Sequence, residues 1–451
     1  MDLSALLPQF GGVAMTLLAF VVALSVIVAI HEYGHYIVGR WSGIKAEVFS
    51  LGFGPVLFSR VDKRGTRWQF AALPFGGYVK FLGDSSAASG KDGAAMEEIA
   101  ETDPALLRQT MHGAPLWART ATVAAGPVFN FIFSIAIFAA VMMTQGKATD
   151  PISIGALKPL PVQGIALQPG DAVLAVAGVD VPGMDDAEAF SAFTDGLPET
   201  ALMDYRVLRD GQELIVPGPH PMPPLVSGLA PQSAAYDIDM RPGDLIISVD
   251  GKPIVSFEQL KDLVESSDGR VLQLQVWRNG ETMDFALAPR RVDEPQRDGG
   301  FKTQWRIGIA GGLAFEPGTE RLGPGAALIG GVDQTWSVMS SSISGLYYMV
   351  TGAISSCNMS GPIGIAQVSG AMASQGAESF IWFIAVLSTA VGLLNLFPIP
   401  VLDGGHLVFY AYEAVAGKPP SDKALRILMA AGLALILSMM VFALSNDLFC
   451  P

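Results

Sequence analysis

Four long apolar runs constrain this chain more than any other feature of its sequence. The first begins at residue 11 and continues past residue 30, and the others cover roughly 120–143, 380–396 and 424–444. About 20 apolar residues in a helix cross the hydrocarbon core of a bilayer, where the backbone must satisfy its own hydrogen bonds. The first run is too long for a signal peptide, and no Lys or Arg precedes it. We therefore expect a multi-pass α-helical membrane protein with four transmembrane helices in contact with the lipid bilayer.

The composition adds a water-soluble part to this membrane part. Half of the 451 residues are hydrophobic and 16% are charged, which is too apolar for a soluble protein and too interrupted for a wholly embedded one. The net charge of −14, with no basic run, gives no attraction to nucleic acid. Cys357 and Cys450 form neither a disulfide framework nor a CxxC pair, and their spacing does not decide whether they pair with each other.

The distribution of basic residues predicts the orientation in the membrane. No Lys or Arg occurs before Arg40 or after Arg426, whereas the loops after the first span and before the fourth are rich in them. Basic loops stay on the cytoplasmic side. Both loops should therefore be cytoplasmic. Both chain ends and the long segment between the second and third spans, roughly 147–376, should lie outside.

A metal-binding motif follows directly on the first apolar run. His31-Glu32-Tyr33-Gly34-His35 has the form H-E-x-x-H. Residues i and i+4 lie on one face of a helix, so both imidazoles can bind one Zn²⁺, and Glu32 is placed to act on water rather than to bind the metal. A charged residue at the bilayer centre costs about 2.5–3.5 kcal/mol on insertion scales, so such residues are usually functional. This context favours a zinc site over a polar cluster that merely ends a helix.

A catalytic zinc usually has three protein ligands, so one more is needed. The stretch that follows the third span contains two candidates, Asp403 and His406. Asp403 is bounded by apolar sequence and a Gly pair, and should lie at the same depth as the end of the first span. His112 is also cytoplasmic but lies in an ordinary polar stretch. Chemistry alone favours Asp403 over His406 without excluding the latter.

The outer segment contains a tandem repeat. Pro169-Gly170-Asp171 and Pro242-Gly243-Asp244 each open a short apolar stretch that ends in a turn, and the two are 73 residues apart. Each unit predicts a strand, a tight turn, a helix (185–193 or 256–266) and a hairpin. This pattern resembles PDZ domains, which bind an extended peptide at a sheet edge, often a peptide C-terminus. The alternative is a pair of small α+β domains that only pack or act as spacers.

The motifs taken together resemble the site-2 protease family of intramembrane zinc metalloproteases, and within it the bacterial regulator-of-sigma-E branch. The resemblance rests on H-E-x-x-H at 31–35 and on an N-x-x-P-x-P-x-L-D-G motif at 395–404. It extends over nearly the whole chain, because the four spans, the tandem repeat, Gly126-Pro127…Asn130-Phe131 in the second span and Ser-Gly-Pro-Ile-Gly at 360–364 also fit.

The resemblance implies roles for further residues. It makes Asp403 the third ligand of the zinc, beside His31 and His35, with Glu32 as the catalytic base. It places a re-entrant, membrane-associated β-hairpin in the first cytoplasmic loop, near the zinc. The residues expected to bind substrate are Asn395, Phe70, Ala71, Gly76 and Gly77. A plain surface hairpin is the alternative.

The resemblance also implies substrates and a location. The partners are single-span membrane proteins cleaved within or near their membrane helix, such as a trimmed anti-sigma factor in envelope-stress signalling or remnant signal peptides. The location is the bacterial inner membrane, with the chain ends and the PDZ-like domains in the periplasm and the active site near the cytoplasmic side.

The expected layout combines four membrane spans with a hairpin and two inserted PDZ-like domains. The segment after the repeats should hold a linker and an amphipathic helix, at about 325–354, that lies on the membrane surface or packs on the repeats. The expected ranges are 1–40 (first span), 41–118 (cytoplasmic loop with hairpin), 119–145 (second span), 150–220 and 221–290 (PDZ-like domains), 291–376 (linker and interfacial helix), 377–410 (third span) and 423–446 (fourth span).

Two other functions compete with intramembrane proteolysis. One is a membrane-anchored zinc protease that acts on soluble proteins, but it would place H-E-x-x-H in water beyond the helix. The other is a non-catalytic PDZ scaffold or zinc-binding protein. The presence of Glu32 argues against the second, because metal binding alone needs no such carboxylate.

Overall fold

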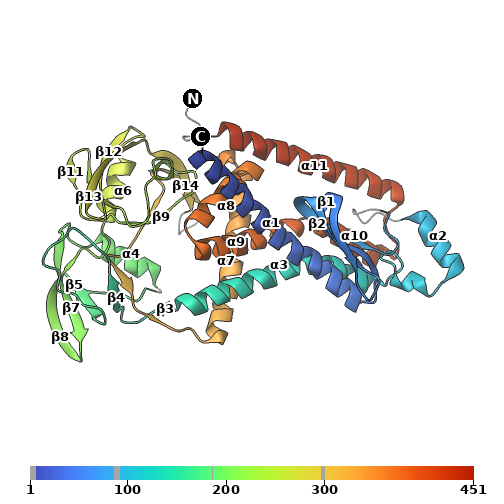
Figure 1. Cartoon of the computed structure of the whole chain (residues 1–451), viewed down its shortest axis with the longest axis horizontal. Coiled ribbons are helices and arrows are strands. Elements are labelled where there is room, and N and C mark those ends of the chain that lie inside the picture. Colours follow the sequence, from blue (N-terminus) through green and yellow to red (C-terminus); the bar gives the residue numbers. More distant parts are fainter. Residues whose placement is uncertain (1–6, 86–91, 185, 296–299, 451) are drawn as a thin grey trace. The chain divides into compact units, whose positions relative to one another are not determined.

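The computed structural model describes residues 7–85, 92–184, 186–295 and 300–450, which form two compact units. The first unit comprises the chain up to residue 141, residues 325–347 and the chain from residue 356 onward. The second comprises residues 142–324 and 348–355. Figure 1 shows long helices in the first unit and small sheets in the second.

Four helices of the described chain are long and apolar enough to cross a membrane. Each coincides with one of the predicted apolar runs, so the expectation of four apolar helices of membrane-spanning length is confirmed. Their bounds are α1 (Leu7–Trp41), α3 (Leu116–Gln145), α9 (Ala377–Asn395) and α11 (Asp422–Phe449).

Small residues bring these helices close together. A Cβ on Gly34 of α1 would lie 2.5 Å from the carbonyl oxygen of Ala125 on α3. A Cβ on Gly370 of α8 (Pro362–Ser374) would lie 2.3 Å from the hydroxyl of Thr16 on α1. In a membrane the hydrophobic effect gives little drive for helix association, so such close backbone packing is a main source of cohesion.

The predicted third span, 377–410, is divided in the structure. Helix α9 ends at Asn395, and a new helix, α10 (Asp403–Ala416), begins at Asp403. Pro398 and Pro400 lie between them; proline has no N–H to donate and disfavours helical conformation in the residue before it. The Asp403 side chain therefore comes from the first turn of a short helix that follows the span.

Strands β1 (Ala46–Val61) and β2 (Arg67–Phe81) form the antiparallel hairpin in the loop that follows the first span. Each strand bends and behaves as two half-strands. The half-strand 46–51 pairs on one side with 77–81 and on the other with 67–70, while 67–71 also pairs with 56–61. The half-strand 77–81 thus lies at one edge of the sheet, and 67–71 lies inside it. The rest of this loop contains α2 (Gly93–Thr102) and η2 (Leu106–Gln109).

A disulfide joins Cys357 to Cys450, which answers the question that their spacing left open. It ties the end of α11 to the short helix η3 (Ser356–Asn358), which contains Cys357 and precedes α8. The Asp447 carboxylate strengthens this junction, because it accepts hydrogen bonds from the backbone N–H groups of Gly361 at 2.7 Å and Ile363 at 3.0 Å. A carboxylate is favourable at a helix N-terminus, where N–H groups lack partners within the helix.

The second unit contains two four-stranded sheets, one for each repeat. Their strand orders are equivalent, β6-β5-β7-β8 and β11-β10-β12-β13. The bounds are β5 (Ala172–Val176), β6 (Val179–Asp180), β7 (Leu202–Arg209), β8 (Gln212–Pro219), β10 (Leu245–Val249), β11 (Lys252–Pro253), β12 (Leu272–Arg278) and β13 (Glu281–Leu287).

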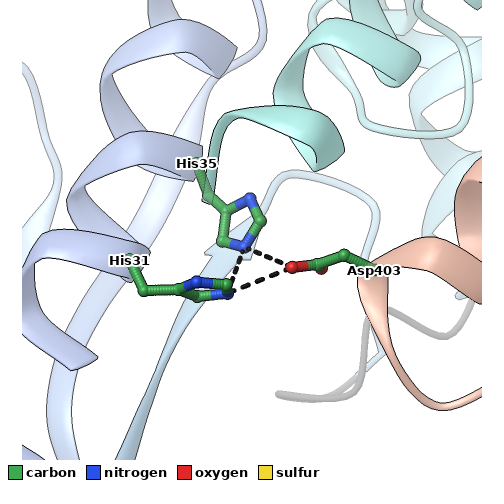
Figure 2. A group of neighbouring side chains, drawn as sticks. All are labelled: His31, His35 and Asp403. Carbon is green, nitrogen blue, oxygen red and sulfur yellow. Dashed lines mark hydrogen bonds and ion pairs between the residues drawn. The ribbon is translucent and has the colours of Figure 1, made fainter. Parts of the chain in front are cut away.

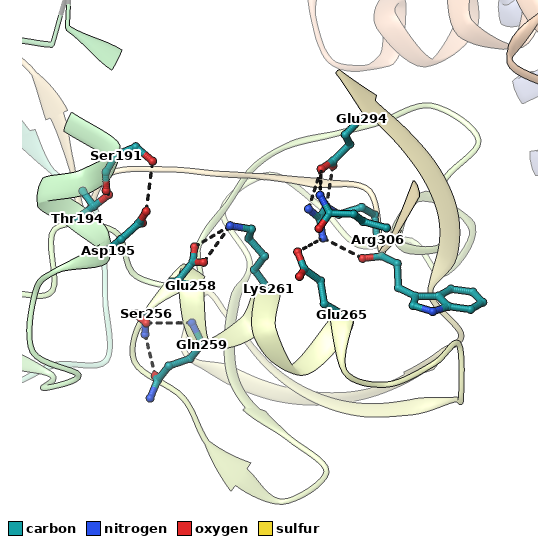
Figure 3. Close-up of polar contacts among 12 residues, drawn as sticks. Ser191, Thr194, Asp195, Ser256, Glu258, Gln259, Lys261, Glu265, Glu294 and Arg306 are labelled. Carbon is teal, nitrogen blue, oxygen red and sulfur yellow. Dashed lines mark hydrogen bonds and ion pairs between the residues drawn. The ribbon is translucent and has the colours of Figure 1, made fainter. Parts of the chain in front are cut away.

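Each repeat also has one principal helix. Helix α4 (Ala187–Asp195) belongs to the first repeat; the predicted start of this helix, Asp185, lies outside the described residues. Helix α6 (Phe257–Glu265) belongs to the second, close to the prediction, and a capping box between Ser256 and Gln259 starts it (Figure 3). The second repeat has a further short helix, α5 (Ala234–Asp237).

The aspartate of each Pro-Gly-Asp motif has the same structural role. Asp171 and Asp244 are both 1% exposed, and each accepts two hydrogen bonds from an arginine, Arg209 and Arg278 respectively, at 2.6–2.7 Å. A buried carboxylate needs such a partner. These ion pairs explain why the aspartate and the arginine recur at matching places in the two repeats.

The chain after the second repeat forms strands rather than a simple linker. Strand β16 (Ile309–Gly311) pairs with β9 (Val226–Leu229) of the second repeat, and β17 (Phe315–Pro317) pairs with β4 (Ile154–Leu157) of the first. The two hydrophobic cores therefore include residues beyond the predicted ranges 150–220 and 221–290. Three further strands are β14 (Arg290–Pro295), β15 (Phe301–Arg306) and β18 (Thr319–Glu320), the last paired with β3 (Lys147–Ala148).

An ion-pair cluster fastens β15 to the second repeat. Arg306 bonds to Glu294 of β14 at 2.6 Å and to Glu265 of α6 at 2.5 Å (Figure 3). Helix α7 (Pro324–Val350) follows these strands. Its small-residue face lies on α3, where a Cβ on Gly331 would be 2.6 Å from the carbonyl oxygen of Ile135, while Trp336 on another face is 67% exposed.

The Asp171–Arg209 ion pair gives a test of the first repeat. The hydrogen bonds of Arg209 lower the pKa of the Asp171 carboxyl. A lowered pKa contributes stability above the unfolded-state value of about 4, and this stability is lost as the pH falls through the folded-state value. Asp171→Asn should lower the urea midpoint of β5 and β7 in pulse proteolysis at pH 7. The difference from wild type should shrink below about pH 4.

The control is Asp180→Asn, which removes a surface pair with Arg206 in the same sheet. Asp180 is 83% exposed, so its loss should change the midpoint little. Equal effects of the two substitutions would contradict the role assigned to the buried pair.

Candidate metal centre

Three predicted ligands from two distant parts of the chain meet in the structure. His31 and His35 lie one turn apart on α1, and Asp403 is the first residue of α10 (Figure 2). Asp403 Oδ2 lies 3.1 Å from His31 Nε2 and 3.5 Å from His35 Nε2, and the two Nε2 atoms are 3.1 Å apart. Two imidazole nitrogens and one carboxylate oxygen thus face one point.

The donor set fits a metal ion. Asp403 Oδ2 is buried and has no hydrogen-bond partner, although it faces two nitrogens. A buried carboxylate oxygen in this position is explained if a cation lies among the three atoms. Two His and one carboxylate are a common ligand set of catalytic zinc sites. In the described part of the chain, no other group of His, Cys, Asp or Glu comes together in this way.

The rival ligands do not join this group. His406 lies in the same cavity but outside the three-atom cluster. His112 also lines the cavity, and its Nε2 lies 3.2 Å from Asp84 Oδ1. The geometry therefore favours Asp403, in agreement with the resemblance.

Glu32 lies beside the three ligands without belonging to them. It lines the same cavity, which has a volume of about 880 Å³ and also includes His31, His35 and Asp403. The edge half-strand of the hairpin lies beside it, since a Cβ on Gly77 would be 3.0 Å from Glu32 Cγ. Glu32 therefore stands between the hairpin and the cavity.

Only some of the residues expected to bind substrate line the cavity. Gly77 and Asn395 line the cavity, and Asn395 Nδ2 donates to the Val391 carbonyl at 3.0 Å. A Cβ on Gly77 would lie 3.0 Å from Glu32 Cγ, so glycine allows the sheet edge to approach α1. Gly76 packs on the Phe53 ring. Phe70 and Ala71 lie on the inner half-strand, away from this wall of the cavity.

Helix α3 contributes residues that the sequence argument did not assign to the site. His35 Nδ1 lies 2.9 Å from the carbonyl oxygen of Thr122, and Asn130 reaches His31. Gly126 faces both rings: a Cβ there would lie 2.4 Å from His35 Nε2 and 2.8 Å from His31 Cε1. The Gly126-Pro127…Asn130 pattern was the available signal, but it served only as evidence of resemblance.

Comparison with known proteins agrees with this geometry. The family model "Peptidase family M50" matches residues 19–439. A provisionally named zinc metalloprotease of Rhizobium meliloti is 36% identical over 96% of both chains, and one of Agrobacterium fabrum is 33% identical over 99% of both. The regulator of sigma-E protease RseP of Salmonella typhimurium is 31% identical over 97% of this chain and 99% of its own.

One solved structure resembles a smaller part of the chain. A PDZ domain of Listeria monocytogenes is 19% identical and covers 19% of this chain and 84% of its own, with a TM-score of 0.16. That score is too low to define the fold of the matched segment.

Fold, site and relatives together define the class of protein. Residues of four apolar helices line the cavity that contains the His, His and Asp cluster and the adjacent glutamate, and full-length relatives carry the name of metalloproteases. The chain is a metalloprotease of the membrane. It belongs to peptidase family M50.

The close approach of Gly126 to both histidines gives a test of the site. Gly126→Ala should displace the two rings and lower metal binding at least tenfold, a loss of about 1.4 kcal/mol or more. The measurement is zinc content of the purified full-length protein after dialysis against a weak chelator. Gly345→Ala on α7, where an added Cβ would meet nothing within 4 Å, is the control and should retain wild-type zinc. Undiminished zinc in Gly126→Ala would contradict the observed packing.

Proposed function

We propose that His31, His35 and Asp403 hold a catalytic Zn²⁺ and that Glu32 is the general base and acid of peptide hydrolysis. The observation that carries this proposal is the meeting of three ligand atoms within 4.8 Å of one another, with Glu32 on the wall of the same cavity. The names of the relatives support zinc as the metal.

The proposed metal ion and Glu32 would have different roles in peptide hydrolysis. A zinc ion in this position would polarise the scissile carbonyl and lower the pKa of a water molecule towards about 7. Glu32 accepts the proton of the attacking water and later delivers it to the leaving amine nitrogen. The edge half-strand of the hairpin lies against Glu32 at Gly77 and limits how its side chain can turn during both transfers.

The proposed substrates are single-span membrane proteins cleaved within or near their membrane helix. The site follows an apolar run on α1, which supports substrates that lie in the bilayer. The relative named regulator of sigma-E protease supports an anti-sigma factor as one substrate, with remnant signal peptides as another class. The competing scaffold function is not favoured, because the chain belongs to a peptidase family.

The edge of the hairpin sheet is the proposed place where substrate is held extended. Carbonyl groups in a helical substrate are already hydrogen-bonded, so the segment must unwind before cleavage. The half-strand 77–81 lies at the sheet edge beside Glu32, and an extended segment can add to such an edge. Asn395, which lines the cavity, is proposed to bond the exposed substrate backbone. Phe70 and Ala71 would act only by supporting this edge from the inner half-strand.

The proposed location is the bacterial inner membrane, with the chain ends and the repeats in the periplasm. Basic residues near the first and fourth spans support this orientation. The Cys357–Cys450 disulfide also supports it, because disulfides persist in the periplasm and are rare in the cytosol. The PDZ-like nature of the two repeats is supported by their equivalent four-stranded sheets with one principal helix each. Binding of peptide C-termini to them stays a prediction.

Glu32→Gln gives the first test of this function. The amide keeps the size of the side chain but cannot accept the proton, so cleavage of a trimmed single-span substrate in proteoliposomes should fall about 10²–10⁴-fold. Zinc content should stay at the wild-type level, because Glu32 is not a proposed ligand. Chelation should abolish wild-type activity. Equal cleavage by Glu32→Gln and wild type, at equal zinc content, would refute the mechanism.

The proposed substrate edge is tested at Gly77. Gly77→Ala adds a methyl group that would lie 2.9 Å from Val28 and 3.0 Å from Glu32, so the edge half-strand must move away from α1. Cleavage should fall at least tenfold in the same assay, with zinc retained. Phe70→Ala is the comparison: Phe70 is 55% exposed on the inner half-strand, and its change should be much smaller. The reverse order of effects would reject the proposed edge.

A further inference from the structure

Asn130 on α3 is fully buried beside the proposed zinc ligands. Its Nδ2 atom lies 3.2 Å from His31 Nδ1, and its Oδ1 atom is buried without a hydrogen-bond partner. An unsatisfied buried carbonyl costs about 1–3 kcal/mol, and such groups are rare in folded proteins. The contact with His31 therefore needs an explanation.

The zinc site requires a particular form of each histidine. Both His31 and His35 turn Nε2 towards Asp403, so Nε2 is the nitrogen that offers its lone pair to a metal. In a neutral imidazole the other nitrogen, Nδ1, must then carry the proton and donate a hydrogen bond. His35 meets this requirement, because its Nδ1 lies 2.9 Å from the carbonyl oxygen of Thr122, an atom that can only accept.

His31 has the same requirement, and Asn130 is the group that faces its Nδ1. The two ends of an amide side chain have nearly the same size and can exchange by a rotation of 180°. After that rotation Oδ1 faces Nδ1–H of His31, and the carbonyl oxygen gains a donor. With Nδ1 protonated, the same contact is then an N–H···O hydrogen bond in place of two N–H donors that face each other.

We propose that Asn130 is the positioning residue of His31: its side-chain carbonyl accepts the Nδ1–H of His31 and keeps Nε2 directed at the metal. This inference rests on the zinc site proposed above. Thr122 and Asn130 thus act as a pair on α3, with one hydrogen-bond acceptor for each histidine.

The backbone of Asn130 is itself fixed by the neighbouring helix. Its carbonyl oxygen accepts hydrogen bonds from Ser134 Oγ at 2.9 Å and from Ser388 Oγ of α9 at 3.1 Å. Gly392 lets α9 lie close, because a Cβ there would be 3.1 Å from Asn130 Cβ. The acceptor is therefore held in place by contacts that do not involve His31, as a positioning group must be.

The experiment measures zinc release from the full-length protein in detergent to an excess of a colorimetric chelator. Asn130→Leu keeps about the same size without an acceptor, and should release zinc about 10–100-fold faster than wild type. Asn130→Asp retains an acceptor oxygen but has no N–H to donate, and should stay close to wild type. Ser369→Ala is the matched control, since it removes a buried hydroxyl-to-carbonyl hydrogen bond on α8 without touching Asn130 or His31.

The outcomes separate this inference from the proposed site. Slow release from Asn130→Leu, or fast release from Asn130→Asp with an unchanged melting temperature, would overturn the inference. If Asn130→Leu does not fold, Asn130→Ala replaces it, with the same expected result. His31→Ala tests the site itself: if that variant keeps its zinc, the proposed ligands are wrong whatever Asn130 does.

Discussion

The arrangement of the first unit depends on one constraint: polar side chains on the apolar helix α1 need partners within the protein. Two histidines and a glutamate continue a run that is otherwise suited to lipid. The two histidines find partners within the protein, and the glutamate lies against the hairpin. Asp403 comes from α10, Thr122 and Asn130 from α3, and Gly77 of the hairpin lies beside Glu32. The packing of these three elements around α1 is therefore a consequence of where its polar groups stand.

Glycine makes that convergence possible. Gly34 lets α1 and α3 touch, Gly126 makes room for both imidazoles, and Gly77 admits the sheet edge to α1. In soluble proteins glycine usually serves turns, but here all three positions lie where one backbone approaches another element. The turn between α9 and α10 completes the arrangement, because Pro398 and Pro400 stop one helix before Asp403 starts the next.

The sequence predicted the parts of this structure that depend on local signals. The four spans follow from hydropathy alone, and His31, Glu32 and His35 follow from their spacing. Asp403 could be favoured over His406 but not separated from it, since that decision depends on a turn between two helices. The contacts of Asn130 and Thr122 with the histidines could not be predicted from the sequence. An asparagine carries no signal of such a role, and Thr122 acts through its backbone carbonyl. The return of β16 and β17 onto the two repeats was missed for a similar reason: short strands that pair across 80 to 160 residues carry no local pattern.

The disulfide between Cys357 and Cys450 has a consequence for how the enzyme is assembled. It closes a covalent ring of the chain that contains α9, Asp403 and α11. The ring cannot close until the fourth span, which follows Asp403, has been synthesised and inserted. The carboxylate that would complete the proposed metal centre thus belongs to a segment that is secured only late in biosynthesis. A nascent chain with the first three spans in place would contain every proposed catalytic residue, but the ring that carries one of them would still be open.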